Sequence, residues 1–203
     1  MKDRFIELLR KMGAKGDFDS AFETLAMEYS GARRYYHTLR HVRNCLDEYS
    51  EVRDLAVSPN TLEFALWYHD IVYNTKSENN EARSAALAHQ AAIDLGLPGF
   101  VRRGAFDLIM LTKHNSKPDS EDGKIMVDVD LSILGSPVEE FDVYEEGIRK
   151  EYSGVKENVF KRERRKILQG FLERDPLYLT NHFREKYEDQ AKANLERSIA
   201  KLS

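Results

Sequence analysis

Residues 64–73 of the chain are Phe64-Ala65-Leu66-Trp67-Tyr68-His69-Asp70-Ile71-Val72-Tyr73. This is the richest apolar stretch of the sequence, and an adjacent histidine and aspartate interrupt it. Burying an imidazole and a carboxylate among aromatic side chains is costly unless a partner satisfies them. A bound metal ion would be such a partner, because both groups are ligands for Zn, Mn, Fe, Co and Ni. The stretch therefore predicts an apolar helix that ends at a metal site.

Three other segments supply side chains of the same chemistry. Upstream, His37 and His41 are four residues apart, so they share one face if the segment is helical. Downstream, Asp128 and Asp130 lie in an apolar run. Asp130 is the better candidate ligand, and Asp128 is expected either to hydrogen-bond to a ligand or to cap a helix. His114 fits a further ligand, a ligand of a second metal or a phosphate contact, and equally a solvated histidine at a helix end.

Composition indicates one intracellular domain. The chain has 203 residues, of which 41% are hydrophobic, enough for one well-buried core. The net charge of −4 gives no general attraction to nucleic acid or to an anionic membrane. No apolar run approaches membrane-spanning length. The N-terminus is charged and amphipathic rather than a signal peptide, and a single cysteine suits a reducing cytoplasm. We therefore expect a cytoplasmic location and no membrane partner.

The apolar spacing predicts an all-α fold. Apolar residues recur at helical intervals along most of the chain, which indicates about ten helices and only weak strand signals. Three serine- or aspartate-proline pairs have the N-cap-then-proline pattern of helix starts: Ser58-Pro59, Ser136-Pro137 and Asp175-Pro176. Gly96 has the place of a helix stop.

The motifs, in this order, resemble the HD superfamily of metal-dependent phosphohydrolases, in particular a compact single-domain branch of predicted enzymes. The first and last motifs also resemble those of cyclic-nucleotide phosphodiesterases. The resemblance covers most of residues 30–200. It rests on Tyr36-His37-x-Leu39-x-His41-Val42, Ala65 to Tyr73, Asn80-Glu81-x-x-Ser84-Ala85, Asp128 to Gly135, Arg149 to Tyr152 and Phe171 to Tyr178.

The resemblance implies one HD-type helical bundle over residues 1–203, with the metal-site core at about 30–135 and the C-terminal helices 136–203 packing on it. It implies one divalent ion (Mn, Fe, Co, Ni, Zn or Mg) and leaves a second open. The implied ligands are His41, His69, Asp70 and Asp130. His37 would take the place of a general acid.

The implied reaction is hydrolysis of a phosphoester in a small molecule, most plausibly a nucleotide. The metal would polarise a phosphoryl oxygen and lower the pKa of a bound water. Asp70 would orient or deprotonate that water, and His37 or His114 would protonate the departing oxygen. Side chains near these motifs in the sequence could contact the substrate; they are Arg33, Arg34, Lys113, Asn80 and Glu81.

Other interpretations compete with the enzyme. A metal- or ligand-binding HD domain without turnover, acting as sensor or scaffold, would use the same ligands. The basic run 161–166 invites nucleic-acid binding, but its glutamate and helical context favour a solvated helix face. Cys45, four residues after His41, is expected to be a small buried hydrophobe rather than a ligand. Assembly as a homodimer stays open.

Overall fold

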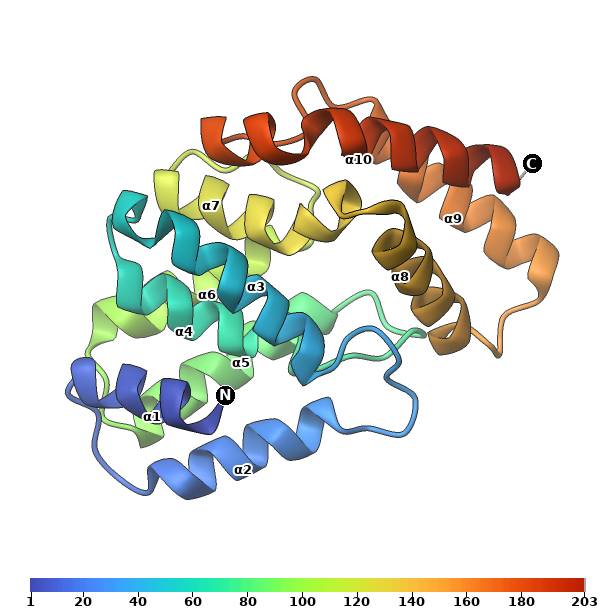
Figure 1. Cartoon of the computed structure of the whole chain (residues 1–203). Helices are drawn as coiled ribbons and strands as arrows, with labels where there is room; N and C mark the ends of the chain where they lie inside the picture. Colours follow the sequence, from blue (N-terminus) through green and yellow to red (C-terminus); the bar gives the residue numbers. More distant parts are fainter. Residues whose placement is uncertain (203) are drawn as a thin grey trace. The chain divides into compact units, whose positions relative to one another are not determined.

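A computed structural model describes residues 1–202 and confirms the all-α class. Within those residues the chain forms ten α-helices and two short 3₁₀ helices, with no strand. None of these helices is long and apolar enough to cross a membrane. The elements, labelled in Figure 1, are α1 (Lys2–Lys11), α2 (Phe18–Tyr29), α3 (Leu39–Val52), η1 (Arg53–Leu55), α4 (Pro59–Tyr68), α5 (Asn80–Asp94), α6 (Gly99–Leu111), α7 (Glu121–Asp130), η2 (Leu131–Gly135), α8 (Val138–Glu151), α9 (Glu157–Leu172) and α10 (Asn181–Lys201).

The chain divides into two compact units, residues 1–127 and residues from 128 onward. The division falls inside α7, so the last turn of that helix belongs to the second unit. Organisation as one domain over the whole length stays a prediction.

Helix α4 is the centre of the first unit. Helices α1, α3, α5 and α6 all pack against it (Figure 1), and every residue from 61 to 68 is buried. A helix that is apolar on all sides is stable only in such a core. Its one buried acid, Glu63, accepts a hydrogen bond of 2.9 Å from Arg4 Nε and lies 3.5 Å from Arg53 Nε.

Of the four expected helix boundaries, two are confirmed, one is displaced by one residue and one is wrong. Pro59 is the first residue of α4. Gly96 follows α5 with a φ of 65°, a left-handed conformation that glycine adopts without steric cost. Pro137 was expected to be the first residue of α8, but the helix begins one residue later, at Val138.

The Asp175-Pro176 pair does not begin a helix; the next helix, α10, begins at Asn181. Carboxylates accept the backbone N–H groups of the intervening segment instead. Glu188 accepts from Leu177 at 3.0 Å and from Tyr178 at 3.1 Å. With its donors satisfied in this way, the segment needs no helical hydrogen bonds.

The second unit is built on α10, which packs against η2 and α9. Gly135 permits η2 to pack closely against α10, because a Cβ at position 135 would collide with Tyr187 of that helix. The side-chain amide of Asn194 donates to the carbonyls of Leu134 and Ser136, both at 2.9 Å.

Candidate metal centre

The first pair of candidate side chains comes from helix α3. His41 and Cys45 lie one turn apart on its buried face, with 4% and 1% of their surface exposed. Thr38 is the N-cap, and its hydroxyl accepts the N–H of Arg40 at 3.3 Å. His37 therefore precedes the helix, and the expectation that it shares a helical face with His41 is wrong.

His69 directly follows α4 and is 1% exposed. Its Nδ1 lies 2.8 Å from the carbonyl oxygen of Leu66. A carbonyl can only accept, so Nδ1 carries the hydrogen and the neutral ring presents its lone pair on Nε2. Metal-binding histidines are commonly oriented by such a backbone hydrogen bond.

The Nε2 atoms of His41 and His69 and the carboxylate of Asp70 converge. The two nitrogens are 3.0 Å apart, and Asp70 Oδ2 lies 3.3 Å from His69 Nε2 and 3.5 Å from His41 Nε2. Nitrogen ligands bound at about 2.0–2.1 Å to one ion are separated by roughly 2.9–3.4 Å in octahedral or tetrahedral geometry. The three atoms therefore have nearly the spacing of ligands around one ion.

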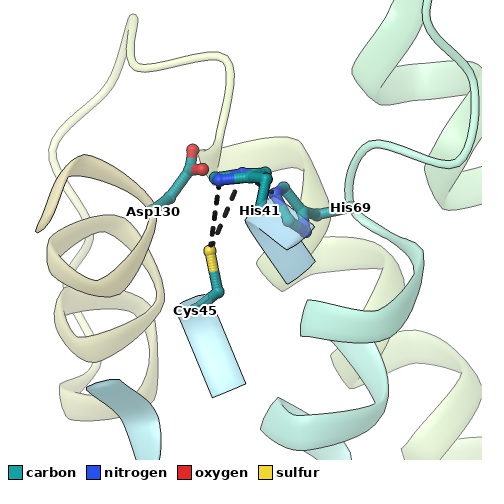
Figure 2. Close-up of side chains that lie close together, drawn as sticks. All are labelled: His41, Cys45, His69 and Asp130. Atoms are coloured by element: carbon teal, nitrogen blue, oxygen red, sulfur yellow. Dashed lines mark hydrogen bonds between the residues drawn. The ribbon is translucent and has the colours of Figure 1, made fainter. Parts of the chain in front are cut away.

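Cys45 also lies among these atoms, which the sequence did not reveal. Its Sγ is 3.7 Å from both ring nitrogens of His41, as the dashed lines in Figure 2 show. His41, Cys45 and His69 each offer a ligand atom within 4.8 Å of the others. The prediction that Cys45 is buried is confirmed, and the prediction that it packs rather than coordinates stays a prediction. Its spacing of four residues from His41 was the available signal.

Arg34 connects the two turns that carry the histidines. Its Nη1 donates to the carbonyls of His37 at 2.9 Å and Asp70 at 2.8 Å, and its Nη2 donates to Ile71 at 2.7 Å. These contacts give Arg34 a structural task. Its predicted contact with a phosphate is not tested by them and stays a prediction.

Tyr29 supports the same region from α2. Its hydroxyl donates to the carbonyl of Trp67 at 3.1 Å and accepts the N–H of Asp70 at 3.3 Å. Burial above all, and then the nearby Asp70, raises the pKa of Tyr29 well above its ordinary value. The phenol therefore stays protonated and holds the start of the His-Asp turn. The guanidinium of Arg34 lies 5.0 Å above its ring.

His37 is half-buried at the edge of the cluster. Its ring stacks on Tyr73 with centroids 4.0 Å apart, and its Nε2 lies 3.8 Å from Asp70 Oδ2. The ring thus sits beyond the converging ligand atoms, beside the carboxylate.

The other candidates of the first unit lie on its loops and at the start of α5. His114 follows α6, with a φ of 55°. Lys113 Nζ donates to the carbonyl of Glu78 at 3.3 Å. Asn80 is the first residue of α5. Its side-chain amide accepts the N–H of Asn74 and donates to the carbonyl of Asn74, each at 3.0 Å. Glu81 lies in the first turn of α5.

Arg33 is exposed. The proposed contacts of Arg33, Lys113, His114, Asn80 and Glu81 with a substrate stay predictions.

The two acids of α7 that the sequence singled out belong to the second unit. Asp130 is the last residue of α7 and is half-buried; Figure 2 also draws it. Asp128 is fully buried and accepts the backbone N–H groups of Leu179 at 2.8 Å and Thr180 at 2.7 Å. Because Thr180 is the N-cap of α10, Asp128 stabilises the start of that helix.

The basic run 161–166 is partly neutralised within α9. Arg164 is buried, in contrast to the expected solvated face, and pairs with Glu145 and the hydroxyl of Tyr144. Glu163 pairs with its neighbours Arg162 at 2.7 Å and Lys166 at 3.2 Å. These contacts reduce the cationic surface that a nucleic acid would need.

No protein-family model, curated protein or solved structure matches this chain. Membership of the HD superfamily therefore stays a prediction from the motifs.

Proposed function

We propose that this chain is a metal-dependent phosphohydrolase of the HD type. The observation that carries the proposal is the convergence of His41 Nε2, His69 Nε2 and Asp70 Oδ2 within 3.0–3.5 Å of one another. Three groups that can all be ligands, brought this close in a buried setting, are stabilised when a cation lies between them. Asp130 is proposed as the further ligand, on the strength of its motif and its position at the end of α7.

The reaction divides among the chain's own residues. A divalent ion, when bound, supplies Lewis-acid polarisation of a phosphoryl oxygen and an acidified water. Asp70 has its second role here, because a carboxylate beside the ion can orient the attacking water and accept its proton. His37, held 3.8 Å from that carboxylate, would donate a proton to the departing oxygen. A small phosphorylated compound, most plausibly a nucleotide, is the proposed substrate.

A metal site without turnover is the second candidate. The burial of His41 and His69, at 4% and 1% exposure, favours it, because closed sites hold structural metals whereas catalytic sites keep one open position. Half-buried Asp70 and His37 favour the enzyme, since they leave one side of the cluster near solvent.

Elemental analysis tests the metal centre first. The purified protein and its Asp130→Ala and His69→Ala variants would be dialysed against metal-free buffer. We expect about one transition metal per wild-type chain and loss of that metal in both variants. Asp107→Ala, an exposed acid on α6, and His89→Ala, a half-buried histidine on α5, are matched controls that should keep it.

The outcomes separate the proposals. Metal that survives in the His69→Ala variant would contradict the site itself, and metal that survives only in Asp130→Ala would remove Asp130 from the ligands. Loaded protein would then be assayed with phosphomonoesters, phosphodiesters and nucleotides. Tight metal binding with no cleavage of any class would favour the non-catalytic site.

A further inference from the structure

Cys45 is placed to do more than fill space beside His41. It is the only cysteine of the chain, it is 1% exposed, and its Sγ lies 3.7 Å from both ring nitrogens of His41. We propose that the thiolate of Cys45 is a direct ligand of the metal centre and that it makes this centre selective for thiophilic ions. This inference rests on the proposed function only in requiring that a metal binds.

The distances place the sulfur close to a ligand position, although His41 must turn to complete it. A nitrogen at about 2.0–2.1 Å and a sulfur at about 2.3 Å from one tetrahedral ion lie roughly 3.6 Å apart. Cys45 Sγ lies 3.7 Å from both ring nitrogens of His41. Equal distances put the sulfur beside the ring rather than along the Nε2 lone pair, so coordination by both side chains requires the imidazole to turn about its Cβ–Cγ bond. The helix itself sets this arrangement, because residues four apart on α3 present their side chains one above the other.

The setting also favours coordination. A buried thiol in apolar surroundings stays protonated and inert, whereas a neighbouring metal ion stabilises the thiolate. On binding, the sulfur lone pair forms the bond to the ion and the thiol proton leaves to solvent. The result is a mixed imidazole, thiolate and carboxylate site.

Sulfur changes which ions the site holds. Thiolates select soft or borderline ions such as Zn²⁺, Co²⁺ and Cd²⁺, whereas Mg²⁺ and Mn²⁺ prefer oxygen ligands. With Cys45 as a ligand, the centre would bind zinc-like ions in preference to the other ions that histidines and carboxylates alone accept.

Cobalt substitution tests this without any assay of activity. Metal-free protein would be titrated with Co²⁺ while the ultraviolet and visible spectrum and the bound-metal stoichiometry are recorded. We expect one Co²⁺ per chain with a thiolate-to-cobalt charge-transfer band in the near ultraviolet. Since the chain has one cysteine, such a band assigns Cys45 directly.

The wild-type spectrum decides between the two ideas. Stoichiometric Co²⁺ binding without the charge-transfer band overturns the role of Cys45 and leaves the metal centre intact. Absence of Co²⁺ binding, with Zn²⁺ and Mn²⁺ also failing to bind, overturns the metal centre and this inference with it.

Variants then measure selectivity. In Cys45→Ser and Cys45→Ala we expect the band to disappear. Affinity for Cd²⁺ should fall by more than the roughly 10–100-fold that loss of an outer partner typically costs, while affinity for Mn²⁺ changes far less. Equal losses for both ions would contradict a sulfur ligand. Ala88→Ser, at a fully buried position of α5, is the control for a small polar change in the core.

Discussion

His37 lies close to the candidate ligands but outside the group of atoms that converge. It lies in the turn before α3, stacked on Tyr73, with its Nε2 3.8 Å from Asp70 Oδ2. The spacing to Asp70 exceeds those of His41 and His69 from the same oxygen. In the proposed mechanism His37 is therefore assigned to proton transfer and not to the ligands.

We expect His37→Ala to retain the metal and to lose turnover by roughly 10²–10⁴-fold, the usual range for loss of a general acid or base. Elemental analysis and the phosphoester assay of the same preparation check both halves. His89→Ala is the control for loss of a half-buried histidine elsewhere. Release of metal from His37→Ala would instead make His37 a ligand.

For single residues, the sequence predicted which side chains could bind a metal better than it predicted which groups each side chain contacts. His41, His69 and Asp70 were recognised from their types and spacing, and the structure does bring them together. Arg34 was expected near phosphate because it is cationic, yet its guanidinium bonds to three backbone carbonyls. Cys45 was expected only to be buried, because its spacing of one helical turn from His41 is the same for a residue that packs and for one that lies among ligand atoms.

Among the elements, α4 is held at its start by an acid from α7. Asp122 accepts the backbone N–H of Val57 at 2.7 Å and of Ser58 at 2.9 Å. Ser58 is the N-cap of α4 but makes no side-chain capping bond. The carboxylate of Asp122 therefore fixes the two residues that lead into α4, and its charge suits the positive end of the helix.

We expect Asp122→Ala to lower the free energy of unfolding by about 1–3 kcal/mol, because it leaves two backbone donors without their acceptor. Asp122→Asn keeps one acceptor oxygen and should lose less. Urea denaturation monitored by circular dichroism measures both. Exposed Asp119→Ala should stay within about 0.5 kcal/mol of wild type. An equal effect of the two alanine variants would contradict a stabilising role for the bonds from Val57 and Ser58 to Asp122.

The start of α4 was predictable from the local Ser58-Pro59 signal, and it is confirmed. Helix starts were not predictable where distant carboxylates replace helical hydrogen bonds. The segment before α10 is the example, since Glu188 and Asp128 accept its backbone N–H groups. Such a partner lies far away in sequence and leaves no local pattern.

For the whole molecule, metal binding should stabilise the chain unevenly. A ligand that binds only the folded state at 100 times its Kd contributes about 2.7 kcal/mol. We expect Zn²⁺ to slow hydrogen exchange in α3 and in residues 66–71, as measured by mass spectrometry of peptic peptides. Peptides of α9 (Glu157–Leu172), which holds no proposed ligand, are the internal control.

The peptide containing Asp130 carries the most information in that experiment. If Asp130 is a ligand, exchange at the end of α7 slows together with α3. Slowing confined to α3 and residues 66–71 would restrict the site to the first unit. No slowing in either region, with metal bound, would place the ion elsewhere.

The bonds of Arg34 bear on the speed at which a metal ion could leave. One guanidinium holds the carbonyls of His37, Asp70 and Ile71, so the turn before α3 and the turn after α4 share one tether. Neither turn can swing outward without breaking charge-assisted hydrogen bonds to the other. Any release of a bound ion that requires these turns to open would therefore have to break bonds of this arginine, and the residence time of the ion would then depend on Arg34 as well as on the ligands.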